Sequence, residues 1–196
     1  MPFVNLKYGA DAFASYKASF DSSVSVVVQS FGMAHEIGCR LEHEKYMALA
    51  LREARKAARI GEVPIGAVIV KDGIVIGRGY NRSESGKDPT LHAEMIAIRR
   101  ASKKLGAWRL VGCTMYVTVE PCTMCAGAAV LARLDAIVTG AESDKSGACG
   151  SVKDILMSGD LNHRVGYSAG VLGRECADLL SGFFKELRSR SGEAER

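Results

Sequence analysis

Apolar side chains recur at helical spacing where the regular part of the chain begins. Between residues 41 and 61 they are Tyr46, Met47, Leu51, Ala54 and Ala58. Gly61 and Pro64 follow directly, as they do after the last turn of many helices. This pattern predicts an amphipathic helix that ends at Gly61.

Two short apolar runs, 65–70 and 74–81, come next and are separated by the residues Lys-Asp-Gly. Asp-Gly supplies the positive φ angles that a tight turn needs, so the pair predicts a β-hairpin. Further along, helical and strand patterns alternate. They predict helices at 90–106, 122–134, 152–158 and 173–188, and strands at 114–119 and 135–141. A hairpin followed by this alternation favours an α/β fold with a mixed central sheet and helices on its faces.

Residues 1–40 do not share this regularity. Their β-branched run at 23–28 has no partner strand nearby. A secretory signal has a basic start followed directly by an apolar stretch, whereas here the apolar run begins only near Val24, behind Asp11 and Asp21. We expect either a poorly packed leader or a start codon assigned too early, with Met33 or Met47 nearer the true beginning. The predicted organisation is a leader at 1–40, a domain at 41–190 and a short tail at 191–196.

Composition narrows the class of protein without selecting a function. The chain has 196 residues, of which 47% are apolar, so it can bury the core of one domain. No apolar run reaches the roughly 18 residues of a membrane span. The six cysteines are too sparse for a disulfide framework and favour a reducing, cytoplasmic location. A net charge of +4 permits a polyanionic partner but does not require one.

Two pairs of chemically active side chains stand at predicted helix starts. His92 and Glu94 open one helix, and Cys122 and Cys125 open the next. The N-termini of such helices lie at one edge of the sheet, so the four side chains can converge. One imidazole and two thiolates form a three-ligand zinc set that leaves a fourth position for water, as catalytic sites do.

The glutamate gives this set a chemical purpose. Two thiolates neutralise Zn²⁺, so the metal acidifies water less than it would with three imidazoles. A nearby base is then needed, and Glu94 can take a proton from water and return it to a ring nitrogen and a departing amine. The parts suit hydrolytic loss of ammonia from an amine-bearing aromatic carbon.

Each pair alone is weak evidence. His-x-Glu is usually a pair of solvated helix residues, and Cys-x-x-Cys can be a redox pair or half of a structural zinc site. Together, His-Ala-Glu followed about thirty residues later by Pro-Cys-x-x-Cys matches the signature of zinc deaminases. We therefore favour a catalytic zinc, and interpret Cys39, Cys113, Cys149 and Cys176 as structural or incidental.

The sequence resembles the cytidine deaminase-like superfamily and, within it, the bacterial tRNA adenosine deaminases, over about Glu42 to Leu187. The stretches that carry the resemblance are "EVPIGAV", "GYNR", "DPTLHAE", "VEPCTMCAGA", "GACGS", "NHRV" and "ECADLLSGFFK". The resemblance implies a three-layer α/β/α sandwich, one zinc per subunit, a homodimer, and conversion of the wobble adenosine in tRNA anticodons to inosine.

It also implies roles for particular residues. His92, Cys122 and Cys125 would bind zinc and Glu94 would be the proton shuttle. The anticodon stem-loop and its flipped nucleoside would meet Asn81, Val63, Pro64, Ala93, Lys145, Phe183 and Phe184. Where the family usually has Asp two residues before the loop lysine, this chain has Ser143, with Asp144 one step later. Either the loop shifts to present Asp144, or a hydroxyl makes that contact.

Other readings stay open at this point. A deaminase of free guanine or a free nucleoside shares the same core motifs, and would turn over small molecules without RNA. A zinc-stabilised RNA-binding module or a redox protein would need no Glu94. Basic residues that could meet RNA phosphates, or could be solvated surface residues, are Arg82, Lys87, Lys145, Arg164, Lys185, Arg188 and Arg190. We expect Trp108 and Tyr116 in the core or an interface, and His43 and His163 as surface or hydrogen-bonded side chains.

Overall fold

The computed structural model describes the backbone of residues 22–194 and the side chains of residues 40–190. The chain divides into two compact units, Met1–Leu41 and Glu42–Arg196. Helix α1 spans Ser22–Arg59, so the β-branched run at 23–28 is helical. Residues 1–21 lie outside the described part, and the character of the leader stays a prediction.

A five-stranded mixed sheet forms the centre of the second unit. Its strands are β1 (Gly66–Lys71), β2 (Ile74–Tyr80), β3 (Cys113–Val119), β4 (Ala136–Ala141) and β5 (Gly166–Ser168). Their order across the sheet is β2-β1-β3-β4-β5. β1 is antiparallel to β2 and β3, whereas β3, β4 and β5 are mutually parallel. β2 and β3 therefore run in the same direction and end at the same edge.

The predicted hairpin is confirmed, and its turn has the expected geometry. Asp72 and Gly73 have φ angles of 48° and 75°, the left-handed values that a tight two-residue turn requires. The strands pair from Gly66 with Tyr80 to Lys71 with Ile74, with one irregularity between Ile69 and Val70. The turn chemistry thus sets the register of the first two strands.

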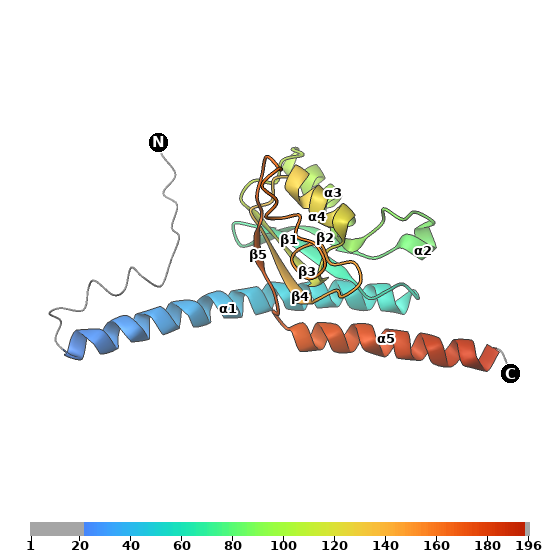
Figure 1. Ribbon diagram of the computed structural model, residues 1–196, viewed down its shortest axis with the longest axis horizontal. Coiled ribbons are helices and arrows are strands. Elements are labelled where there is room, and N and C mark those ends of the chain that lie inside the picture. Colours follow the sequence, from blue (N-terminus) through green and yellow to red (C-terminus); the bar gives the residue numbers. More distant parts are fainter. Residues whose placement is uncertain (1–21, 195–196) are drawn as a thin grey trace. The chain divides into compact units, whose positions relative to one another are not determined.

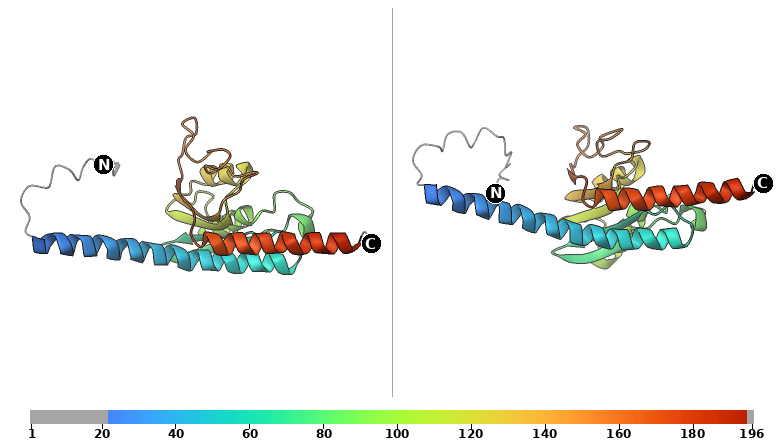
Figure 2. Two further views of the ribbon diagram at one scale, coloured as in Figure 1. Left: turned by 60° about the horizontal axis from the view of Figure 1, so that its bottom comes forward. Right: turned by 90° about the horizontal axis from the view of Figure 1, so that it is seen from below.

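Helices cover both faces of the sheet, as Figure 1 shows. α3 (Ala93–Leu105) and α4 (Thr123–Leu131) pack on one face, where their alanines meet Ile69, Met115 and Val117. Residues 42–59 of α1 and helix α5 (Gly173–Ala194) cover the other face, around Met47, Val68 and Val138, and run side by side in both views of Figure 2. The predicted three-layer α/β/α class is confirmed.

Glycines on β2 bring α3 unusually close to the sheet. A Cβ atom at Gly79 would lie 2.0 Å from the carbonyl oxygen of Ala93, and one at Gly77 would lie 2.4 Å from that of Ala97. Only residues without a side chain permit this approach. The close contact fixes the first turn of α3, which carries His92 and Glu94.

Several predicted details are wrong. Residues 152–158 form turns instead of a helix, because their backbone groups pair with residues 147–150 and with the side chain of Asp154. The short strand β5 and the four-residue helix α2 (Ser83–Gly86) were not predicted. α5 continues to Ala194, beyond the end predicted at residue 188, whereas the predicted division into a domain at 41–190 and a tail at 191–196 stays a prediction. None of the described helices is long and apolar enough to cross a lipid bilayer.

Candidate metal centre and active site

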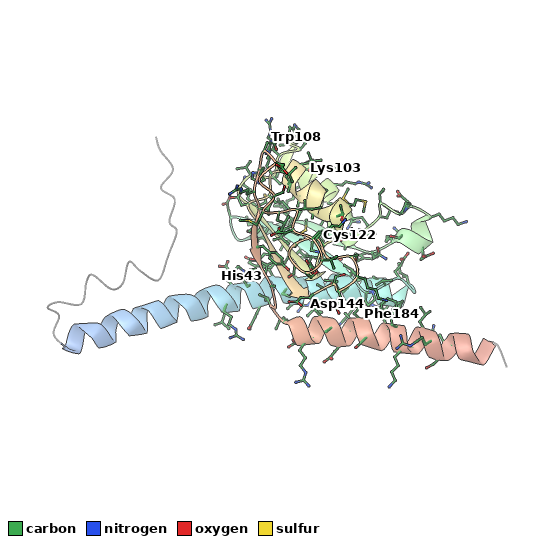
Figure 3. The ribbon with its side chains drawn as sticks, viewed as in Figure 1. His43, Lys103, Trp108, Cys122, Asp144 and Phe184 are labelled. Atoms are coloured by element: carbon green, nitrogen blue, oxygen red, sulfur yellow. The ribbon has the colours of Figure 1, made fainter. Side chains whose placement is uncertain are left out.

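The strand ends and helix starts bring the predicted metal ligands together. His92 is the N-cap of α3 and Cys122 the N-cap of α4, both with extended backbone angles. α3 follows β2 and α4 follows β3, and these strands end at the same edge of the sheet. Cys125 lies one turn into α4 and is buried. Cys122, labelled in Figure 3, is half-buried.

The distances among these donor atoms suit a tetrahedral metal. The Nδ1 atom of His92 lies 3.7 Å from the Sγ atom of Cys122 and 3.5 Å from that of Cys125. All three donor atoms lie within 4.8 Å of one another. Zinc–nitrogen and zinc–sulfur bonds at the tetrahedral angle place N and S about 3.6 Å apart. The donor set therefore fits zinc in both chemistry and spacing.

The two thiols and the imidazole also shift each other's pKa. Hydrogen bonds with Cys125 and His92 lower the pKa of Cys122 to about 3, which favours its thiolate form. The hydrogen bond to Cys122, together with burial, raises the pKa of Cys125. A hydrogen bond with Cys122 raises the pKa of His92. The site is thus prepared to hold positive charge.

Glu94 lies in the first turn of α3 and is 4% exposed. Burial raises the pKa of its carboxyl group, and its side chain forms a hydrogen bond with Cys125. A carboxylate whose pKa is raised is a stronger base than an exposed one, as a general base requires. Glu94 therefore lies beside Cys125, one of the three candidate metal ligands.

Asn81 follows β2 directly and is also buried. Its Nδ2 atom donates to a carboxylate oxygen of Glu62 at 3.0 Å, and its Oδ1 atom accepts from the hydroxyl of Ser83 at 3.1 Å. Glu62 is 1% exposed and also accepts from the backbone N–H groups of Glu84 and Ser85. No role for Glu62 was predicted from the sequence, although its position between a helix-ending glycine and Val-Pro is a local pattern that points to it.

Glu120 is a second buried carboxylate that the sequence analysis missed. It accepts from the backbone N–H groups of Ser143, Cys149 and Ser151, at 3.2, 2.9 and 3.1 Å. Burial opposes its charge, but the Ser151 and Cys149 donors hold its pKa below the ordinary value. Glu120 thus fixes the loop after β4, which lies against Cys122 through a bridge between Cys122 and Gly147.

The same loop carries the residues at which this chain departs from the family pattern. Ser143 uses its hydroxyl within the loop, 3.1 Å from that of Ser146, whereas Asp144 is exposed. Lys145 lines a pocket of about 310 Å³ together with Cys122, Thr123 and Lys153. Figure 3 shows Asp144 on the α5 side of Cys122. The choice between Asp144 and a hydroxyl for the contact to the substrate stays a prediction.

Phe183 and Phe184 lie on α5, and their rings meet edge to face with centroids 5.5 Å apart. Phe183 lines a pocket of about 320 Å³ with Arg59, Arg190 and Leu187, and Phe184 is 37% exposed. The pocket therefore combines aromatic and cationic side chains at the surface. The seven basic residues named from the sequence are all exposed, and Arg190 pairs with Glu186.

The remaining predicted residues have varied surroundings. Val63 is half-buried and Pro64 buried before β1, and Ala93 is buried at the start of α3. His43 pairs with the Tyr116 hydroxyl at 3.0 Å and His163 with the Leu134 carbonyl at 2.7 Å, so both are hydrogen-bonded. Tyr116 is buried, as predicted. Trp108 is 60% exposed and therefore lies outside the core, so of its two predicted places only an interface stays a prediction.

Comparison with known proteins agrees with this site. The model of the MafB19-like deaminases matches residues 41–188. A tRNA-specific adenosine deaminase of Bacillus subtilis (strain 168) is 46% identical over 155 residues, which cover 79% of this chain and 96% of the relative. The chain belongs to the family of the tRNA-specific adenosine deaminases.

Solved structures place the chain among the adenosine deaminases of this fold. A structure of a tRNA:A34 deaminase, from work on A-to-I editing at the wobble position of transfer RNA, is 44% identical, with a TM-score of 0.67. The match covers 69% of this chain and 99% of that one. A guanine deaminase from Nitrosomonas europaea is more distant, at 26% identity and a TM-score of 0.62 over 71% of this chain and 83% of that one.

Proposed function

We propose that this deaminase uses zinc to hydrolyse the wobble adenosine of tRNA anticodons to inosine. One observation carries the proposal: His92, Cys122 and Cys125 present three donor atoms at tetrahedral spacing, with the buried carboxyl group of Glu94 beside them. The tRNA-specific relatives, at 46% identity, support the choice of substrate.

Zinc would be held by the imidazole of His92 and the thiolates of Cys122 and Cys125, where it would supply a Lewis acid that activates water. Glu94 would take a proton from the attacking water, and the raised pKa of its carboxyl group favours retention of that proton until it is transferred. Glu94 would deliver this first proton to the ring nitrogen, where it stays in the product. It would then carry the second proton of the same water from the new C6 hydroxyl to the amino group. Water replaces the amino group at C6 of adenine, and ammonia leaves.

Substrate contacts follow from the surroundings of the site. Val63, Pro64 and Ala93 would form walls of the base pocket, and Asn81 would hydrogen-bond the flipped nucleoside. Lys145 and Asp144, on the loop held by Glu120, would meet the backbone of the anticodon loop. Phe183 and Phe184 would meet the same loop from α5. Unpaired anticodon bases need little energy to leave their stack, which suits a buried site.

A homodimer and a cytoplasmic location are part of the same proposal. Both rest on resemblance to the family. Light scattering after size-exclusion chromatography measures the molar mass in solution directly. A mass equal to that of one chain would refute the proposed homodimer.

The second candidate is deamination of free guanine, favoured by the likeness to the guanine deaminase from Nitrosomonas europaea. Parallel assays separate the two functions. Zinc-replete protein is incubated with a tRNA transcript of anticodon ACG, with free adenosine and with guanine, and ammonia release is measured. We expect release only from the tRNA. Release from guanine with none from tRNA would replace the proposal with the second candidate.

A further inference from the structure

We propose that Glu62 is a positioning residue, which fixes the side-chain amide of Asn81 in the one orientation that can serve the substrate. The inference rests on the proposed function, because it assumes that Asn81 contacts the nucleoside. Glu62 itself touches no substrate in this account. It acts through Asn81 and through the turn that follows it.

The hydrogen bonds around Asn81 determine which side of its side-chain amide is the nitrogen and which is the oxygen. A carboxylate can only accept, so the atom 3.0 Å from Glu62 must be the Nδ2 donor. The hydroxyl of Ser83 then donates to Oδ1 from the other side, at 3.1 Å. A flipped amide would set its oxygen against a buried carboxylate. Glu62 and Ser83 therefore select one of two orientations that have nearly the same shape.

Glu62 remains ionised in spite of its burial. Burial opposes the charge, but N–H donors from Ser85 and Glu84 and the nearby Arg82 hold the pKa of the carboxyl group below its ordinary value. The Ser85 contact is short, at 2.6 Å. A charged acceptor with three donors forms stronger hydrogen bonds than a neutral one does. The orientation of Asn81 is thus held at neutral pH.

The same carboxylate connects two segments of the proposed base pocket. Glu62 directly precedes Val63 and Pro64, and its oxygens bind the backbone of residues 84 and 85 just after Asn81. The backbone of Asn81 also donates to the carbonyl of Ile65. A buried carboxylate with three hydrogen-bond donors has little freedom to move, so Glu62 holds the segment at 62–64 and the amide of Asn81 in one arrangement.

The hydrogen-bonding groups of Asn81 that remain free determine which substrate group its side chain can bind. One N–H of Nδ2 and one lone pair of Oδ1 are left after Glu62 and Ser83 are satisfied. This face complements a substrate group that accepts and donates side by side, such as a ribose hydroxyl. Loss of the orientation should weaken substrate binding while the metal site stays complete.

The test compares Glu62→Gln with Glu53→Gln. Glu53 is also a buried glutamate, 2% exposed, but it pairs with Lys56 and Arg78 and makes no contact with Asn81 among the described interactions. We expect Glu62→Gln to raise the KM for an anticodon stem-loop about tenfold or more, the loss of one charge-assisted hydrogen bond. We expect kcat to change less, zinc to stay at one per chain, and Glu53→Gln to keep its KM within twofold.

Three results would overturn the inference. The first is a KM for Glu62→Gln within twofold of that for Glu53→Gln. The second is a loss of zinc in proportion to the loss of activity. If Glu62→Gln does not fold, Ser83→Ala is tested instead, because it removes only the hydroxyl that donates to Oδ1 of Asn81. The third result is an unchanged KM for Ser83→Ala. Absence of inosine with the unaltered protein would instead refute the proposed function, so the two failures are distinguishable.

Discussion

Removal of Glu120 tests whether the loop beside the metal site is held by one buried carboxylate. The substitution Glu120→Ala deletes the acceptor of three backbone N–H groups, from Ser143, Cys149 and Ser151. Ser151 is exposed and Ser143 half-buried, so water can replace part of what they lose. Cys149 is 2% exposed, and its N–H group is left without an acceptor.

The expected loss follows from these three contacts. An orphaned buried donor costs about 1–3 kcal/mol, and each of the two accessible bonds contributes about 1 kcal/mol. The free energy of unfolding should therefore fall by about 3–5 kcal/mol, a large share of the roughly 5–15 kcal/mol typical of a domain. For a protein of this size the Tm falls by about 6–20 °C.

Urea unfolding at pH 7, at one protein concentration, measures this loss, with Glu142→Ala as the control. Glu142 is an exposed glutamate at the start of the same loop, and its removal should change the free energy by less than about 0.5 kcal/mol. The folded-state pKa of Glu120 is lowered, so its contribution is fully present above the unfolded value near 4.5. It is lost as pH falls through the folded value.

The difference between the unaltered protein and Glu120→Ala should accordingly shrink under acid conditions below that range. A loss under 1 kcal/mol at pH 7, or one equal to that of Glu142→Ala, would refute the reasoning. Zinc content measured on the same samples would show how far the loop supports Cys122.

Three further changes have expected outcomes. Gly79→Ala places a Cβ 2.0 Å from the carbonyl oxygen of Ala93, so the Tm and the zinc content should fall. The control Gly127→Ala, whose Cβ would meet nothing within 4 Å, should leave both unchanged when calorimetry and metal analysis compare the two variants. Lys145→Ala should weaken RNA binding and reduce the slope of log affinity against log salt by about 0.7, measured by fluorescence anisotropy; an unchanged slope would exclude a phosphate contact. Cys125→Ser replaces a thiolate ligand with a poor one, so metal analysis should find well under one zinc per chain, and full occupancy would contradict its role.

The sequence predicted the elements whose cause is local. Asp72 and Gly73 determine the hairpin by their own φ preferences, and the spacing of His92 to Glu94 and of Cys122 to Cys125 places each pair on one helix start. Convergence of the pairs followed from the fold class. These features depend on a few residues that are close together in the sequence, so they can be predicted from the local residue pattern.

Features that depend on distant partners were missed. The oxygens of Glu62 and Glu120 bind backbone N–H groups more than twenty residues away, and no local pattern identifies such acceptors. The helix predicted at 152–158 is absent because the side chain of Asp154 accepts from Met157, and residues 150 and 153 pair with each other. Both errors reflect hydrogen bonds that compete with or extend beyond regular secondary structure.

Formation of inosine in a tRNA transcript of anticodon ACG, located by sequencing, tests the central claim most directly. Zinc-replete protein is compared with Glu94→Ala, whose zinc content is measured in parallel. The account predicts inosine at the wobble position alone, and none with Glu94→Ala although it binds one zinc per chain. Inosine formed equally by Glu94→Ala, or none formed by zinc-loaded unaltered protein, would contradict it.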